Sequence, residues 1–370
     1  MTDRVAIGGW VDSRFGAVCD TFADQMNTGR AVGAAVAVVQ DGRLVLDLHT
    51  GRQDPMRGIS WSAQTVTPLF CLGKAVTAVA VLMLASRKLV DLDAPVARYW
   101  PAFGAAGKDQ VTVRHLLSHS AGLPAFPIPR PARLIPYWQI LVNDLANAAP
   151  QCPPGTVVAE HALTFGHLVG ELVRQVDGRP LGVFLRDEIA GPAQLDLALG
   201  LTPKRQAHAA HVRHADQQWL PRTLGLPYTL RQRALDCPVG ALDPQVINSV
   251  WGRRAPLPAV NIYGTARSVA MLFSTVLSAS RHQNASLLDP VLATDLGRVH
   301  IEGYDLVLNQ SIRRGLGVVV DDGGNWGVAA LGGNLLAVDP AAGRIVVYLS
   351  SELGDERAAA AILKAARGCG

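Results

Sequence analysis

Residues 68–74 read PLFCLGK and run directly into an apolar segment. The spacing of the apolar residues predicts a helix over residues 73–88. Residues three positions apart share one face of a helix, so Cys71 and Lys74 are expected to point to the same side. Cys71 would lie at the helix N-terminus, where unpaired N–H groups, the helix dipole and a nearby ammonium favour a thiolate. The segment therefore predicts a nucleophile.

Strand-forming runs lie near both ends of the chain. Residues 34–39 and 43–48 are rich in β-formers and are separated by Gln-Asp-Gly, which is typical of a hairpin. Residues 335–338 and 344–350 predict a second hairpin, and an alanine-rich helix is expected over residues 355–367. Because these hairpins are far apart in sequence, they share a sheet only if the chain between them folds aside.

The middle of the chain is expected to be mainly helical. Residues 112–118, 163–176 and 266–278 carry apolar residues at helical intervals. The sequence therefore predicts an α/β plus all-α protein. Residues 1–70 and 310–370 would form an antiparallel-sheet domain, and residues 71–309 would form a mainly helical domain, with the active site at their junction.

The composition is that of an ordinary globular protein. The 370 residues carry a net charge of +4, and 49% of them are hydrophobic. The positive excess is spread along the chain, so neither nucleic acid nor a membrane is expected as a partner. Five cysteines without a C-x-x-C pair do not predict a disulfide scaffold or a zinc site. The longest apolar run is shorter than the roughly 20 residues that span a bilayer, and no signal peptide is evident, so a cytoplasmic protein is expected.

Further segments follow residues 71–74 in a characteristic order: residues 92–101 (LDAPVARYWP), 113–124 (VRHLLSHSAGLP), 154–156 (PGT), 261–267 (NIYGTAR) and 331–334 (LGGN). Along nearly the whole chain this series resembles the serine β-lactamase and penicillin-binding-protein superfamily, especially class C β-lactamases and family VIII esterases. In that superfamily a Ser-x-x-Lys motif opens a helix where the two domains meet. The resemblance implies a β-lactamase-like fold, with an antiparallel sheet flanked by helices and a helical insertion domain.

The chain departs from the superfamily pattern at three motifs. The serine of the first motif is Cys71, whereas the lysine is kept as Lys74. Counting from the Pro-Gly-Thr segment, Glu160 occupies the position of the superfamily's tyrosine and is followed by His161. Where a lysine or histidine normally lies on a strand beside the site, the chain reads WGVAA from Trp326 onward. The missing cation argues against a β-lactam substrate, whose carboxylate that position usually helps to bind.

The candidate catalytic residues are Cys71, Lys74, Glu160 and His161. A thiol needs less help from a general base than a hydroxyl does, which suits Cys71 as the nucleophile. Glu160 either holds Lys74 protonated through an ion pair or exchanges a proton, if burial raises its pKa. His161 is a second candidate for proton transfer, although a structural role is favoured. The resemblance implies an oxyanion hole built from the N–H groups of Cys71 and of the strand after Trp326.

Four further residues are predicted to contact the substrate. Tyr263 and Asn261 lie in a segment that resembles the superfamily's wall beside the nucleophile, and Trp326 and Val328 lie on the third-motif strand. A tyrosine in an apolar stretch is more often part of the core. The histidines at positions 208, 211 and 214 lack a cysteine or carboxylate partner, so neither a metal nor a cofactor is expected.

These observations predict an acyl-transfer enzyme of the acyltransferase, thioesterase or esterase/amidase type. The Cys71 thiolate would form an acyl-enzyme with a small-molecule acyl donor, such as an ester or a carrier-protein or coenzyme A thioester, in a specialised biosynthetic pathway. Two alternatives stay open. Glu160 and Lys74 could act as a non-covalent acid–base pair in an isomerase or cyclase, or the chain could be a silenced binding protein. Cys71 could also be an engineered replacement of serine.

Overall fold

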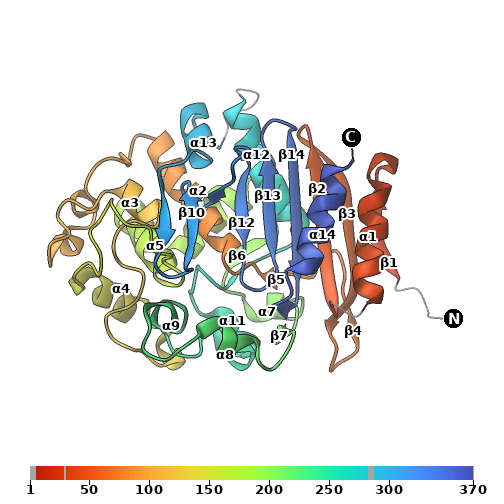
Figure 1. The fold of residues 1–370 in the computed structure, drawn as a ribbon, viewed down its shortest axis with the longest axis horizontal. Helices are drawn as coiled ribbons and strands as arrows, with labels where there is room; N and C mark the ends of the chain where they lie inside the picture. Colours follow the sequence, from red (N-terminus) through yellow and green to blue (C-terminus); the bar gives the residue numbers. More distant parts are fainter. Residues whose placement is uncertain (1–5, 29–30, 282–286, 370) are drawn as a thin grey trace.

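The computed structural model describes residues 6–28, 31–281 and 287–369, and its centre is an antiparallel sheet (Figure 1). The sheet comprises, in spatial order, β1 (Ile7–Val11), β3 (Arg43–Asp54), β2 (Gly33–Gln40), β14 (Arg344–Ser350), β13 (Leu335–Asp339), β12 (Trp326–Ala329), β11 (Val319–Val320), β10 (Gln310–Arg314) and β9 (Ile301–Asp305), and β4 (Ile59–Ser60) pairs with β3. The first and last parts of the chain therefore meet in one sheet, as the sequence predicts.

Both predicted hairpins are confirmed. Strands β2 and β3 pair through a turn at Asp41 and Gly42, which both have positive φ, at 48° and 77°. Such a two-residue turn matches the right-handed twist of the strands, and Gly42 adopts its conformation without steric cost. Strands β13 and β14 form the second hairpin, and β14 pairs along its whole length with β2.

Helices cover both faces of the sheet because its central strands are apolar on both sides. Alternate residues of β2 enter two separate cores. On one face lie α1 (Gly16–Asn27) and α14 (Arg357–Arg367), which pack on each other (Figure 1). On the other face α12 (Ala266–Ser280) packs on β2 and β14, and α2 (Leu72–Ser86) packs on β12.

A helical region lies beside the part of the sheet that carries β10 (Figure 1). Its longest helix, α5 (Thr164–Asp177), is buried along most of its length and packs on α2. The remaining helices are α3 (Val113–Leu117), α4 (Trp138–Asn147), α6 (Leu181–Phe184), α7 (Pro203–Gln206), α8 (Trp219–Leu224), α9 (Leu230–Leu235), α10 (Pro244–Asn248), α11 (Val250–Arg254) and α13 (Pro290–Leu296). Short strands accompany them, namely β5 (Thr67–Pro68), β6 (Leu197–Leu199), β7 (Arg213–His214), β8 (Ile262–Gly264) and β15 (Glu352–Leu353).

The predicted helices agree with α2, α3, α5, α12 and α14, but the predicted boundary at residues 309 and 310 cuts a hairpin. Strand β9 lies in the segment expected to be helical and pairs antiparallel with β10. Its sequence, IEGYD, buries only Asp305, so it has no apolar alternation that would reveal a strand. The division into two domains stays a prediction. None of the described helices is long and apolar enough to span a membrane.

One side chain on α5 makes the stability of the fold dependent on pH. His167 is fully buried, stacks on Trp138 at a centroid distance of 4.7 Å and lies edge-on to Phe126. Neither ring nitrogen has a hydrogen-bond partner among the described residues. Burial lowers the pKa of His167 to about 4. The unfolded chain therefore binds a proton at a higher pH than the folded chain does.

We predict that replacing this histidine weakens the acid sensitivity of the fold. The contribution of neutral His167 is fully present above pH 6.5 and is lost as the pH falls to about 4. Between pH 7 and pH 5 this loss is about 2 kcal/mol of unfolding free energy. In His167→Phe the difference between urea unfolding free energies at pH 7 and pH 5 should shrink by that amount. His208→Phe, at an exposed site, is the control, and an equal acid sensitivity in both variants would contradict the prediction.

Candidate active site

A cavity of about 1180 Å³ extends along strands β10 to β13 and reaches the start of helix α2. Among the predicted site residues, those that line it are Cys71, Lys74, Glu160, Trp326 and Val328. Segments more than 200 residues apart in the sequence thus meet around one space. The cavity is therefore the candidate active site.

Cys71 lies where the chain turns sharply from β5 into α2. It is the N-cap residue of the helix, and Phe70 before it adopts a left-handed backbone conformation with φ of 50°. Such a conformation is costly for a residue other than glycine, and here it directs Cys71 to the cavity wall. A Cβ atom on Gly73 would lie 2.4 Å from the Pro258 carbonyl oxygen, so only glycine lets the first helical turn approach that loop.

Lys74 lies one helical turn after Cys71 and is only 3% exposed. Its Nζ donates to Oε1 of Glu160, with which it forms a buried ion pair. Burial disfavours the charged ammonium, but the electrostatic interactions with Cys71 and with the Glu160 carboxylate outweigh this effect and raise the pKa of Lys74. Lys74 is therefore an ammonium at neutral pH.

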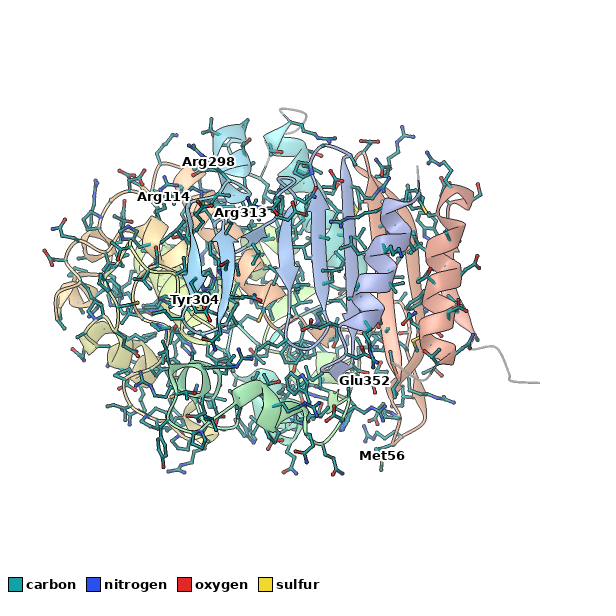
Figure 2. All side chains as sticks on the ribbon, in the orientation of Figure 1. Met56, Arg114, Arg298, Tyr304, Arg313 and Glu352 are labelled. Carbon is teal, nitrogen blue, oxygen red and sulfur yellow. The ribbon has the colours of Figure 1, made fainter. Side chains whose placement is uncertain are left out.

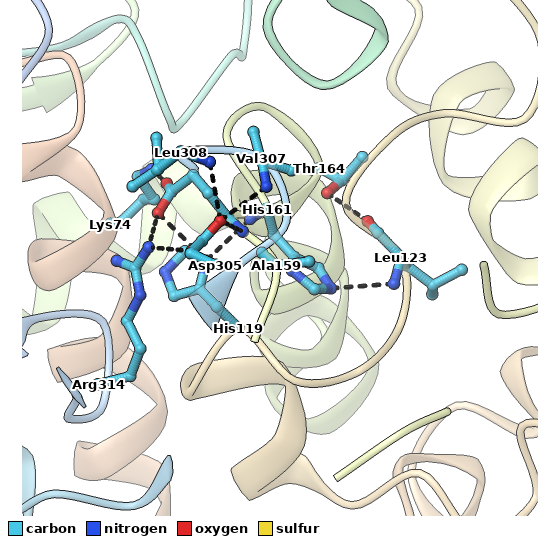
Figure 3. Close-up of polar contacts among 11 residues, drawn as sticks. Lys74, His119, Leu123, Ala159, His161, Thr164, Asp305, Val307, Leu308 and Arg314 are labelled. Carbon is cyan, nitrogen blue, oxygen red and sulfur yellow. Dashed lines mark hydrogen bonds and ion pairs between the residues drawn. The ribbon is translucent and has the colours of Figure 1, made fainter. Parts of the chain in front are cut away.

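Glu160 forms buried ion pairs with two cations, Lys74 and Arg314, both of which are labelled in Figure 3. On the side away from Lys74, Nη2 of Arg314 donates to Oε2 of Glu160 and also to Asp305, at 2.9 Å. Burial alone would raise the pKa of Glu160, but the charges of Arg314 and Lys74 hold it well below its ordinary value. Of the two roles left open for Glu160, this environment favours the ion-pair role over proton exchange.

Arg314 and Asp305 were missed by the sequence analysis. Arg314 ends β10 and Asp305 ends β9, so pairing places them at opposite ends of the hairpin, with Arg314 opposite Ile301 and Asp305 opposite Gln310. They share one face of the sheet, and the long Arg314 side chain reaches along it to Asp305. No motif marks either residue, and a basic pair such as Arg313-Arg314 is usually read as surface charge. Arg314 thus brings a positive charge to the site from β10 of the same sheet.

His161 lies outside the cavity, although the sequence analysis considered it for proton transfer. The ring is fully buried, Nδ1 lies 2.7 Å from the Ala159 carbonyl oxygen, and Nε2 accepts the Leu123 N–H at 3.1 Å (Figure 3). Both nitrogens are therefore occupied, and burial lowers the pKa of His161 to about 4. Its main-chain N–H donates to Nδ1 of His119, which does line the cavity. This geometry favours the structural role.

Tyr263 and Asn261 also lie away from the cavity lining. Tyr263 on β8 is 1% exposed, and burial raises the pKa of its hydroxyl. The side chain of Asn261 accepts the Leu257 N–H at 2.9 Å and donates to the Gly252 carbonyl at 2.9 Å. Because β8 pairs with β5, this segment supports the strand that precedes Cys71.

The end of β12 leaves a main-chain donor in the wall of the cavity that Cys71 also lines. Ala330 donates its N–H to Asn334 on the β13 side, so by strand alternation the N–H of Ala329 faces the β11 side. Pairing between β11 and β12 ends at Val319 and Gly327, because the next candidate partner, Gly317, donates to Leu117 instead. Ala329 is exposed and lines the cavity together with Cys71.

The N–H of Cys71 has no acceptor among the described residues. It and the Ala329 N–H are the donors available for the oxyanion hole that the resemblance implies. Within the part of the chain that the structure describes, no group of three or more histidine, cysteine, aspartate or glutamate side chains could hold a metal ion.

Comparisons with known proteins agree with this architecture. Residues 18–368 match the family model described as Beta-lactamase. The chain is 34% identical over 300 residues to the Esterase/beta-lactamase LipL of Mycobacterium tuberculosis. The matched region covers 78% of this chain and 69% of LipL. The crystal structure of a family VIII carboxylesterase matches with a TM-score of 0.87 and 27% identity, over 98% of this chain and 100% of the other.

A penicillin-binding-protein homologue from Caulobacter crescentus matches with a TM-score of 0.83 and 29% identity, over 98% of this chain and 99% of the other. These matches confirm the fold class that the sequence predicts, an antiparallel sheet with flanking helices. The chain therefore belongs to the β-lactamase family.

Proposed function

We propose that this protein is an acyl-transfer hydrolase of the esterase type in which Cys71 forms a covalent acyl-enzyme. The observation that carries the proposal is the position of Cys71, at the cavity wall and at the N-terminus of α2, one turn before the buried ammonium of Lys74. A thiolate is stabilised by such a combination of helix terminus and cation. The names of the relatives, an esterase/β-lactamase and a carboxylesterase, support ester chemistry.

The reaction proceeds in two steps. The Cys71 thiolate attacks the ester carbonyl carbon, a C–S bond forms, and the tetrahedral oxyanion is held by the N–H groups of Cys71 and Ala329. The C–O bond then breaks, and the alkoxide leaves and takes a proton from water. In the second step the hydroxide left by the first step either attacks the thioester itself or takes the proton of an alcohol that attacks it, the C–S bond breaks, and the thiolate is regenerated. Hydrolysis yields a carboxylate, an alcohol and one proton.

A second, apolar crevice of about 20 Å³ also opens beside Cys71. Its lining includes Phe70, Leu163, Trp219 and Leu353, and Cys71 lies on its wall and on that of the large cavity. We assign the acyl group of the substrate to this crevice. The large cavity is then left free for the leaving group to depart and for the acceptor to enter. Lined without a charged side chain, the crevice disfavours a charged acyl group. A volume of this size holds one or two methyl-sized groups.

The proposed covalent step predicts an adduct on one residue. Incubation with acetyl and butyryl aryl esters and with acyl coenzyme A thioesters should give an intact mass increased by one acyl group, which peptide mapping locates on Cys71. Cys71→Ala should lose at least 100-fold of the hydrolytic rate, whereas Cys19→Ala, on α1, should keep it. Full activity in Cys71→Ala would favour the acid–base pair of Glu160 and Lys74. No adduct and no turnover would indicate a binding protein.

The cysteines should also differ in their reactivity towards iodoacetamide. Burial raises the pKa of Cys152, and it raises the pKa of Cys237 to about 11. At pH 7.5 and with limiting reagent, peptide mass spectrometry should find Cys71 alkylated first, at a rate that Lys74→Ala lowers at least tenfold. Equal rates at Cys71 and Cys152 would contradict the proposed priming of Cys71.

The crevice predicts a residue that limits acyl length. Trp219 lies against Gly354, on which a Cβ atom would come within 2.0 Å of the indole, and its ring is tilted on His214. Trp219→Ala should raise kcat/KM for an octanoyl ester relative to an acetyl ester by at least tenfold, because the removed ring frees space for the chain. Trp251→Ala, at a site 40% exposed, is the matched control. An unchanged preference would place the acyl group elsewhere.

A further inference from the structure

A set of four charged side chains is buried near Cys71, namely Lys74, Glu160, Asp305 and Arg314. A cysteine nucleophile alone requires only one nearby cation. We propose that Arg314, anchored by Asp305, is a positioning residue that keeps Glu160 ionised and Lys74 an ammonium throughout turnover. Lys74 then serves as a fixed cation for the Cys71 thiolate and does not accept its proton. The inference rests on the proposed nucleophilic role of Cys71.

Arg314 is anchored through one end of its guanidinium, whereas its buried Nε has no hydrogen-bond partner among the described residues. The residue is 4% exposed, and one nitrogen, Nη2, contacts both Glu160 and Asp305. Asp305 is fully buried, and its Oδ1 accepts the main-chain N–H groups of Glu160, Val307 and Leu308 at 3.1, 2.9 and 3.0 Å (Figure 3). Because Asp305 binds the main chain of Glu160 while Arg314 binds its side chain, the hairpin β9–β10 fixes the position of the glutamate.

The charges of this set balance when all four groups are ionised. Lys74 and Arg314 carry two positive charges, and Glu160 and Asp305 carry two negative charges. Protonating Glu160 or deprotonating Lys74 would leave an opposite charge buried without its partner, which is costly. The directions of the shifts agree: the pKa of Glu160 is lowered, and the pKa values of Lys74 and Arg314 are raised despite burial.

The other titratable groups around the set do not replace its members. His119 has Nδ1 at 3.8 Å from Glu160, but this nitrogen accepts the His161 N–H, and burial holds the pKa of His119 well below its ordinary value. His161 makes two ring contacts of its own. Arg231, Glu302 and Arg313 also line the cavity.

Removing the guanidinium should therefore disfavour the thiolate. Without Arg314, two buried carboxylates face one ammonium, and a thiolate beside Lys74 would add a further negative charge to this region. The opposite expectation follows if Arg314 only holds the strands together. In that case its loss lowers thermal stability without changing how the reactivity of Cys71 depends on pH.

The experiment measures the rate of Cys71 alkylation by iodoacetamide from pH 5 to pH 10 in the full chain, by peptide mass spectrometry. Arg314→Met should lower the rate at pH 7 at least tenfold and move the inflection of the profile to higher pH. Arg314→Lys, which keeps the charge, should restore most of the rate. The matched control is Arg298→Met, an exposed arginine that is not part of the cavity lining (Figure 2). A profile of Arg314→Met that coincides with wild type overturns the inference.

Wild type provides a measure that does not depend on whether Arg314→Met folds. With Lys74 as a fixed cation, the wild-type profile has one inflection, and Lys74→Arg, which keeps a charge but cannot release a proton, gives a single inflection as well. A second inflection between pH 6 and pH 9 that disappears in Lys74→Arg would show that Lys74 loses its proton and would overturn the inference.

The outcomes separate this inference from the proposed function, because alkylation needs no acyl donor. If Arg314→Met moves the profile but no ester acylates wild-type Cys71, the proposed function fails and the role of Arg314 stands. If esters acylate Cys71 and the Arg314→Met profile matches wild type, the function stands and the role of Arg314 fails.

Discussion

The buried contact of Glu160 with both Lys74 and Arg314 is the interaction on which the site depends. It joins the first turn of α2, the segment after the Pro-Gly-Thr motif and strand β10. A buried ion pair contributes little net stability, because desolvation offsets most of the attraction, but loss of one partner is costly. The network therefore specifies the geometry of the cavity more than it stabilises the fold, and it favours the ammonium form of Lys74 next to the proposed nucleophile.

The sheet places the remaining parts around this network. Strand β12 extends beyond the last residue that pairs with β11. The main-chain N–H of Ala329 is therefore left without a strand partner, in the wall of the cavity that Cys71 also lines. Such a donor depends on the strand register and not on the side chain, so it does not require a lysine or histidine on β12. The same sheet brings Arg314 into the cavity from β10, two strands away from β12.

The sequence predicts the fold better than the site. Hairpins, apolar helices and the Cys-x-x-Lys turn are local patterns, and they locate β2, β3, β13, β14 and α2. The position of Arg314 is set by pairing of β9 with β10, and β9 has no apolar alternation that would reveal it. His161 shows the same limit, since its residue type allows proton transfer and a structural role alike, and its two ring contacts in the interior, which favour the structural role, are visible only in the structure.

Cysteine at position 71 and glutamate at position 160 are chemically consistent with each other. A serine hydroxyl has a pKa far above neutrality and reacts only if a nearby group takes its proton. Lys74, held as an ammonium between Cys71 and Glu160, is a poor acceptor for that proton. A thiol needs only stabilisation of its thiolate, which a fixed cation and a helix N-terminus supply. In the proposed mechanism the charged network thus suits a sulfur nucleophile better than an oxygen nucleophile.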